Sequence, residues 1–229
     1  MVPASARRRR LVTAAALTAF LALAAAPAQR VRVDDWDTHP LGPLSSDTPW
    51  QRYPAESTPF KDPPAIVEDG GRPVLRLATQ GEAMRLGRGM TVDVRRTPWL
   101  AWEWKPLVLP PGGDLRDPKR NDQVGRVSVI FEGMKAVLYV WDTAAPVGAR
   151  MEPDPFDFFQ RVLIVVRSGP DGLGRWSTER RNVLDDYRRA FGEAPRGVKL
   201  VGLESHSNDT RTRTAVLFGR VSFEAPGTK

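Results

Sequence analysis

Three tryptophans, Trp99, Trp102 and Trp104, lie close together in the stretch TPWLAWEWKP at residues 97–106. In a β-strand, alternate side chains point to opposite faces, so Trp102 and Trp104 share one face while Trp99 and Glu103 share the other. An indole ring can fill a core, or it can stack on the apolar C–H face of a sugar ring when it is exposed. Two interpretations follow: a core strand, or an aromatic platform with Glu103 beside it.

Polar side chains on expected strands form a second candidate group. The stretch NDQVGRVSVIF, residues 121–131, places Arg126 and Ser128 on one face of a strand and valines on the other. Arg161 precedes the apolar run VLIVV in a similar way. Arg126, Arg161 and Glu103 could line one concave face and form a polar binding floor. The alternative is a solvated outer face with surface ion pairs, which stabilise a fold only slightly.

A helix is expected at residues 182–191, where apolar side chains recur at helical spacing. Asn182 can cap its start, and Gly192 can end it. The charged residues around this helix include acids and bases that could form a catalytic set, but such residues more often orient a helix through ion pairs. We expect Arg181 and Asp186 to tie the helix to a sheet.

Several other chemistries lack the residues that they require. Asp114 and Asp117 lie in a loop with interleaved arginine and lysine residues, which is unlike a calcium loop. His39 and His206 are too far apart in the sequence for the usual spacing of zinc ligands. The chain has no cysteine and no G-x-S-x-G motif. We expect neither a bound metal nor a cofactor.

Hydrolysis of a glycoside requires two facing carboxylates. The available side chains are those of Glu103, Asp122, Asp142 and Glu204, and nothing in their spacing selects a pair. A polysaccharide-active enzyme therefore stays an alternative without an assigned catalytic residue.

The N-terminus has the pattern of a secretory signal peptide. Four arginines at residues 7–10 precede an uncharged apolar run, and Ala26-Pro27-Ala28 fits a cleavage site. We expect residues 1–28 to be removed and the protein to be periplasmic or secreted. Cleavage reduces the net charge from +7 to near +3, and no basic run indicates nucleic acid. The mature chain has no second apolar stretch long enough to span a membrane.

Short apolar runs separated by turn residues fill most of residues 29–229. Asp69-Gly70-Gly71 is typical of a hairpin turn, and the run RVLIVVRSG predicts a strand buried on both faces. The pattern predicts one all-β domain, an antiparallel, jelly-roll-like β-sandwich with a single short helix near 182–191.

The stretches WLAWEWKP, NDQVGRVSVIF, YVWDTAAPVG, GLGRWSTERRNVLDDYRRAFG and VLFGRVSF resemble the bacterial domain-of-unknown-function family 3047. The resemblance runs from Val33 to Phe223. It implies an exported or periplasmic protein whose fold is similar to that of carbohydrate-binding sandwich modules. Arg167 stands where the family commonly has an acidic residue. The ESHSNDTRTRT turn, residues 204–214, is less acidic than in relatives, which leaves cation binding there in doubt.

The resemblance also favours Asp122, Arg126, Tyr139 and Trp141 as site positions, and Asp142 follows Trp141 at the end of an expected strand. The sequence therefore predicts an exported, non-catalytic module that binds a glycan or another cell-envelope ligand. A protein-interaction role in the envelope is a further alternative, and the oligomeric state is left open. The predicted ligand-binding residues are Trp99, Trp102, Glu103, Asp122, Arg126, Tyr139, Trp141 and Asp142.

Overall fold

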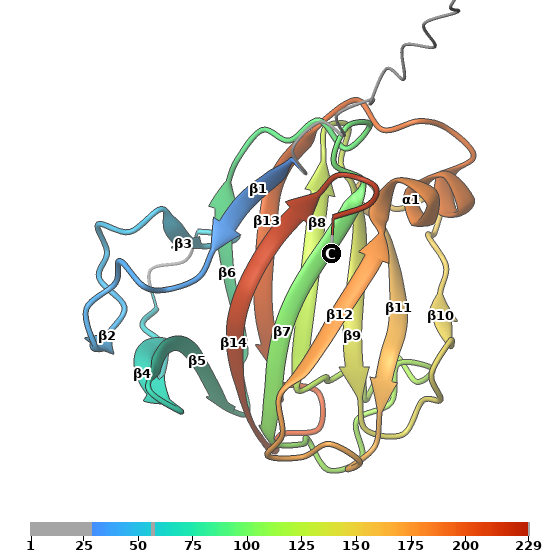
Figure 1. The fold of residues 1–229 in the computed structure, drawn as a ribbon. Coiled ribbons are helices and arrows are strands. Elements are labelled where there is room, and N and C mark those ends of the chain that lie inside the picture. The colour runs from blue at the N-terminus through green and yellow to red at the C-terminus, as the bar shows by residue number, and fades with distance from the viewer. Residues whose placement is uncertain (1–28, 56–57, 229) are drawn as a thin grey trace, which may run out of the picture.

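The computed structural model describes residues 29–55 and 58–228. The predicted signal peptide at residues 1–28 lies outside these residues. The described chain forms two sheets of seven strands each that pack face to face, with one helix at one end of the sandwich (Figure 1). The expected β-sandwich with a single short helix is confirmed.

Sheet A contains the long central pair of the molecule, β7 and β14. The first part of β14 pairs with β5, and its last part pairs with β1. The spatial order of sheet A is β12 (Ser177–Asn182), β7 (Trp99–Val108), β14 (Arg213–Glu224), β5 (Arg72–Gln80), β4 (Ala65–Asp69) and β2 (Gly42–Pro43), with β1 (Arg30–Asp34) beside β14.

Sheet B lies behind sheet A in Figure 1. Within the described residues, every strand pairing is antiparallel except that of β9 (Lys135–Asp142) with β11 (Gln160–Ser168). Residues 143–159 return the chain to the end of the sheet at which β9 begins, so these two strands run in the same direction. The spatial order of sheet B is β10 (Arg150–Met151), β11 (Gln160–Ser168), β9 (Lys135–Asp142), β8 (Gly125–Phe131), β13 (Val198–His206), β6 (Ala83–Gly89) and β3 (Trp50–Arg52).

Aromatic side chains fill the space between the sheets. Trp102 and Trp104, on the inner face of β7, are 1% and 0% exposed. The Trp102 ring stacks on Tyr139 at 5.2 Å, and Trp104 meets Trp141 edge-on at 5.6 Å. The alternation expected for this strand is therefore confirmed, and these tryptophans belong to the core.

A second, smaller apolar cluster lies on the outer face of sheet B. Leu138 and Val140 of β9 and Leu163 of β11 contact Leu115 and Ala145, which come from the loops around residues 110–124 and 143–149. The loops cover this part of the sheet, which explains why four consecutive residues of β11 are buried. The prediction of a strand buried on both faces is confirmed.

The helix α1 (Val183–Phe191) follows β12 directly. Asn182 accepts a hydrogen bond from the Asp185 amide, and Gly192 ends the helix in the left-handed conformation. Arg181 forms an ion pair with Asp186 at 3.0 Å, and Asp186 also accepts a hydrogen bond from Tyr139 of β9. The predicted caps and the predicted Arg181–Asp186 tie are confirmed.

The hairpin between β4 and β5 turns through Gly70 and Gly71, both of which have positive φ, as its sequence predicts. Among the described residues, no helix is both long enough and apolar enough to cross a membrane.

Candidate functional site

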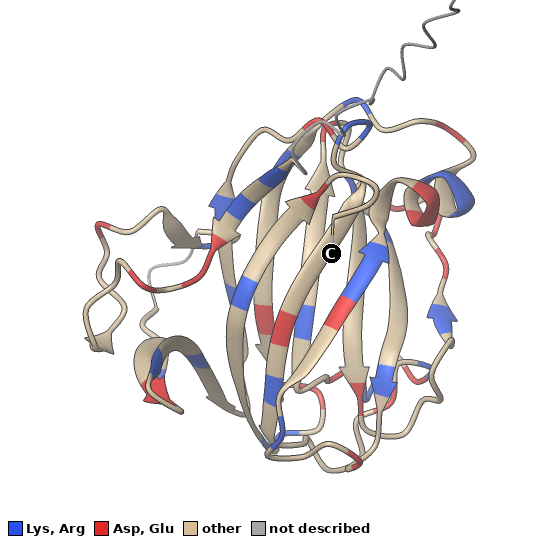
Figure 2. Ribbon diagram, viewed as in Figure 1, with Lys and Arg blue, Asp and Glu red and all other residues tan. Residues whose placement is uncertain are grey.

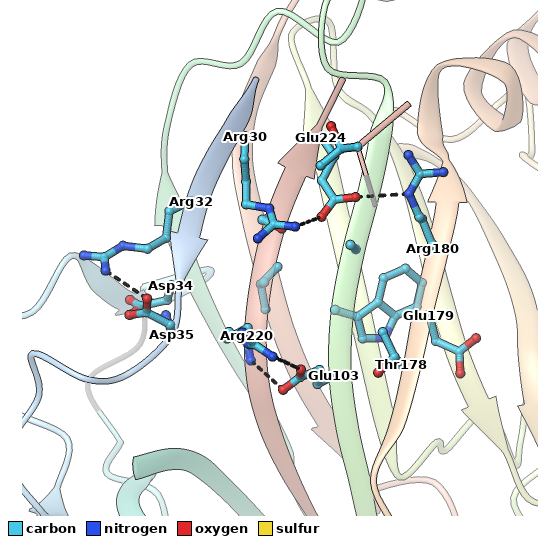
Figure 3. Close-up of a pocket in the computed structure, with 15 residues that line it drawn as sticks. Arg30, Arg32, Asp34, Asp35, Glu103, Thr178, Glu179, Arg180, Arg220 and Glu224 are labelled. Carbon is cyan, nitrogen blue, oxygen red and sulfur yellow. Dashed lines mark hydrogen bonds and ion pairs between the residues drawn. The ribbon is translucent and has the colours of Figure 1, made fainter. Parts of the chain in front are cut away.

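The part of the chain that the structure describes carries a groove on the outer face of each sheet. Groove A, of about 450 Å³, crosses β1, β14, β7 and β12 (Figure 3). Four arginines line it: Arg30, Arg32, Arg180 and Arg220. Five carboxylates lie among them: Asp34, Asp35, Glu103, Glu179 and Glu224.

Every carboxylate of groove A has a basic partner, and red and blue positions alternate across this face in Figure 2. Burial opposes ionisation of Glu103, but Arg72 and Arg220 hold the pKa of this carboxyl below its usual range. The closest pairs are Asp34–Arg88 at 2.8 Å, Asp35–Arg32 at 2.9 Å, Glu103–Arg72 at 2.5 Å, Glu179–Arg167 at 2.6 Å and Glu224–Arg30 at 2.9 Å.

The two half-buried tryptophans of this face are also covered. The guanidinium of Arg180 lies 4.1 Å from the centre of the Trp99 ring, and that of Arg72 lies 4.4 Å from the Trp176 ring. The Trp176 indole donates to Asp69 at 2.6 Å. Cation–π contacts of this kind occupy the ring faces that a sugar would need.

Groove B, of about 490 Å³, lies on the outer face of sheet B. Its polar lining consists of Tyr53 and Ser128, four basic residues (Arg85, Arg126, Arg161 and Lys199) and one carboxylate, Glu204. Its apolar lining consists of Ile130, Met134, Ala136, Leu138, Phe159 and Leu200, with Pro54 from the segment after β3.

The inner end of groove B is a hydrogen-bonded cluster around Glu204. Tyr53 donates to Glu204 Oε1 at 2.5 Å and contacts Ser128 Oγ at 2.8 Å. His206 Nε2 lies 3.0 Å and Arg85 Nε 3.6 Å from Glu204 Oε2. Burial opposes ionisation of Glu204, but these hydrogen bonds and nearby positive charge lower its pKa to about 2. Burial also lowers the pKa of His206 to about 3, so the imidazole is neutral at pH 7.

Two glycines make room for the Tyr53 ring. A Cβ on Gly202 of β13 would overlap the Tyr53 hydroxyl and Ser128 Oγ, and a Cβ on Gly87 of β6 would lie 2.7 Å from the Tyr53 ring. The Tyr53 ring therefore packs on the glycine strip, which consists of Gly87 and Gly202 in sheet B. In this position the ring forms part of the wall of the groove.

Arg126 is the buried cation of groove B. Only 7% of this residue is exposed, and burial lowers the pKa of its guanidinium to about 10. Its Nη2 donates to the Asn121 carbonyl at 2.6 Å, while Nε has no hydrogen-bond partner. Among residues 29–55 and 58–228, no carboxylate forms an ion pair with it within 4.0 Å.

Comparison with known families decides where the chain belongs. The model of the family described as "Protein of unknown function (DUF3047)" matches residues 49–222. The chain belongs to this family. All residues named here as lining groove B fall within the part that matches DUF3047, whereas Arg30, Arg32, Asp34, Asp35 and Glu224 of groove A lie outside it.

Comparison with solved structures finds a match to the xyloglucanase domain of NopAA, a type three effector from Sinorhizobium fredii, in complex with cellobiose. It has a TM-score of 0.45 and 8% identity, and the match covers 76% of this DUF3047 chain and 92% of that chain. No curated protein matches the chain.

The predicted site residues fall into three groups in this DUF3047 structure. Arg126 lines groove B, as does Arg161, which the sequence placed with it. Glu103 is not near them: it lies on the opposite outer face, in groove A, because β7 belongs to sheet A. Trp99 lies on that same outer face beneath Arg180.

The remaining predicted residues lie inside the protein, each exposed by 1% or less. Asp142 accepts hydrogen bonds from the amides of Leu115, Ala144 and Ala145, and Asp122 accepts two from Thr210. These carboxylates hold loops in place. The residues that share this inward placement are Trp102, Asp122, Tyr139, Trp141 and Asp142.

Tyr53 and Arg85 line groove B but are not among the residues predicted from the sequence, and Glu204 was predicted only as one of four available carboxylates. The available signal was a glycine within each of two short apolar stretches, Gly87 and Gly202, since glycine in a strand often marks the close approach of another group. In the described part of the chain, no group of three or more His, Asp or Glu side chains could hold a metal ion.

Proposed function

We propose that this DUF3047 protein is an exported binding module whose ligand, a glycan or another polyhydroxylated component of the cell envelope, occupies groove B. The signal-peptide pattern in residues 1–28 supports export. Binding sites for small ligands and oligosaccharides are typically hollows that combine a few placed polar groups with apolar surface.

The observation that carries this proposal is the composition of groove B. Tyr53, Ser128, Arg126 and Glu204 supply hydrogen-bonding groups at one end. Ile130, Ala136 and Leu200 form an apolar strip beside them. A sugar ring needs the same two kinds of surface, because it has hydroxyl groups at its edge and C–H groups on its face.

Two exposed aromatic side chains lie in the loop that reaches this groove, and both are phenylalanines. Phe156 and Phe158 are 96% and 85% exposed, and they belong to the loop whose Phe159 lines the groove. These rings are available for stacking on a ligand, unlike Trp102 and Trp141 in the core. The proposed aromatic platform therefore consists of phenylalanines.

The geometry favours binding over hydrolysis. Glu204 is the single carboxylate among the described residues that line groove B, whereas hydrolysis of a glycoside uses two. A pKa of about 2 also leaves Glu204 ionised, so it has no proton to donate to a leaving group at neutral pH.

The experiment is calorimetric titration of the mature protein with a panel of neutral and acidic envelope and plant polysaccharides. Leu200→Trp places a large side chain in groove B, and Leu107→Trp makes the same change on the outer face of β7, outside both grooves. We expect saturable binding that is lost in Leu200→Trp and kept in Leu107→Trp. Equal binding by both variants, or no binding of any polysaccharide, would contradict the proposal.

A further inference from the structure

We infer that the ligand of groove B is acidic: a saccharide that carries a carboxylate or sulfate group, bound by Arg126, Arg161 and Lys199. This inference rests on the proposed function and names the class of ligand for the same site. It is carried by the unpaired positive charge of the groove, in contrast with the paired charges of groove A.

The position of Arg126 is the first observation. A guanidinium has five N–H donors and normally pairs with a carboxylate or phosphate when it is buried. The hydrogen bonds of Arg126 within the described residues come from Nη2 alone, and both go to Asn121. Burial makes its charge costly, as its lowered pKa of about 10 indicates. An anionic ligand group would supply the partner that the protein does not.

The carboxylates nearest to Arg126 are held by groups other than its guanidinium. Both oxygens of Glu204 have partners in Tyr53, His206 and Arg85. Asp122 Oδ2 accepts two hydrogen bonds from Thr210, while its buried Oδ1 has no hydrogen-bond partner. Although these acids lie close enough to influence Arg126, neither forms a direct ion pair with it.

Arg161 and Lys199 supply further positive charge at the rim. Both are exposed, and neither forms an ion pair with any residue that the structure describes. Groove B therefore presents four basic residues and one carboxylate, whereas groove A presents four arginines and five carboxylates. The excess positive charge selects an anion, and it also raises the rate at which an anion arrives.

The apolar strip narrows the class of anion. Ile130, Ala136 and Leu200 lie on adjacent strands in one row across the sheet, and Arg161 is at the end of that row beside Ala136. A pyranose ring placed on this strip can direct its acidic group toward the basic residues. A uronic acid and a sulfated sugar both have this combination of an apolar face and a charged edge.

The ligand experiment compares matched pairs of polymers by calorimetry. Polygalacturonate is compared with its methyl ester, and dextran sulfate with dextran, at two salt concentrations. We expect binding of an acidic polymer to be at least about tenfold tighter than binding of its neutral counterpart. A response to polygalacturonate alone identifies a carboxylate site, and a response to dextran sulfate alone identifies a sulfate site.

The protein experiment uses paired charge reversals. Arg161→Glu with Lys199→Glu changes groove B, and Arg175→Glu with Arg213→Glu changes two exposed arginines outside both grooves by the same net charge. We expect the groove B variant to lose about tenfold or more in affinity and the control variant to lose much less. Equal losses would mean that net charge alone attracts the polymer, which would overturn the inference.

A third variant tests Arg126 itself. Arg126→Lys keeps the charge but removes the planar fork that binds two acidic oxygens at once.

If neutral and acidic polymers bind equally well, the inference of an acidic ligand fails while the proposed function stands. If no polymer binds, both fail.

Discussion

The outer faces of the two sheets carry grooves of similar size, about 450 Å³ on sheet A and 490 Å³ on sheet B, and each contains several arginines. On sheet A every lining carboxylate has a basic partner within 2.9 Å. On sheet B, Arg161 and Lys199 have no ion-pair partner among the described residues, and Arg126 is buried without one. Pairing, rather than the number of charges, therefore distinguishes a structural face from a candidate binding face.

The aromatic residues also differ in whether another group covers them. The tryptophans, which attract attention in the sequence, fill the core or lie beneath arginines on sheet A. The exposed aromatic rings in the loop that reaches groove B are those of Phe156 and Phe158. An aromatic residue near a groove can bind a ligand only if one of its faces is free.

The largest expected effect separates core from surface aromatics. Trp102→Ala removes a fully buried ring that stacks on Tyr139, so we expect a loss of about 3–5 kcal/mol in the free energy of unfolding. Phe158→Ala should change stability by less than about 0.5 kcal/mol. Urea denaturation followed by circular dichroism measures both. Similar losses in the two variants would contradict the assignment of Trp102 to the core and Phe158 to the surface.

The second effect is acid destabilisation through the cluster at groove B. His206 has a folded-state pKa of about 3, against an ordinary value of 6.5, so unfolding takes up a proton as the pH falls through this window. Glu204, with a folded-state pKa of about 2 against 4.5, adds to the loss below pH 4.5. The contribution of these groups to the free energy of unfolding should therefore reach its full value above pH 6.5 and should decrease as the pH falls below 6.5.

Thermal melting between pH 7 and pH 4 measures this dependence, and His206→Gln supplies the control because glutamine does not titrate. We expect the melting temperature of the variant to depend less on pH between 6.5 and 4.5. An unchanged slope would show that other groups cause the acid sensitivity.

The third effect tests the glycine strip. Gly202→Ala adds a Cβ where Tyr53 and Ser128 lie, so we expect a loss of about 1–3 kcal/mol in stability together with weaker ligand binding. Gly89→Ala is the matched control on β6, because its Cβ would lie 4.0 Å from the nearest atom, the Lys199 carbonyl oxygen. If Gly202→Ala is as stable as Gly89→Ala, the close packing of Tyr53 on the sheet is wrong.

The smallest effect concerns the ion pairs of groove A. Arg220→Ala removes one of the two arginines that contact Glu103, and the exposed fraction of the Arg220 side chain is 65%, so we expect at most about 1 kcal/mol of destabilisation. Binding at groove B should not change. A larger loss of affinity in Arg220→Ala than in Arg161→Ala would reverse the comparison between the two faces.

Local sequence patterns predicted much of the fold. The capping residues Asn182 and Gly192 define α1, Gly70 and Gly71 turn the β4–β5 hairpin, and alternation places Trp102 inside. Each depends on residues that are close together in the chain. The parallel pairing of β9 with β11 had no such local signal, because it depends on the path of residues 143–159.

The site was only partly predictable for the same reason. Alternation shows that Glu103 and Arg126 point outward, but it does not show that β7 and β8 belong to different sheets. Tyr53 comes from a loop-rich segment, and it reaches Glu204 only because β3 lies beside β6 and β6 beside β13. These contacts link residues up to 151 positions apart, which no short pattern specifies.

The most direct test compares the two faces in one titration series. Calorimetry with polygalacturonate is carried out on the unmodified protein and on two variants of equal net charge, Arg161→Glu in groove B and Arg220→Glu in groove A. The account predicts that Arg161→Glu loses about tenfold or more in affinity while Arg220→Glu binds nearly as well as the unmodified protein. Loss of binding in Arg220→Glu with full binding in Arg161→Glu would contradict the account and move the ligand to sheet A.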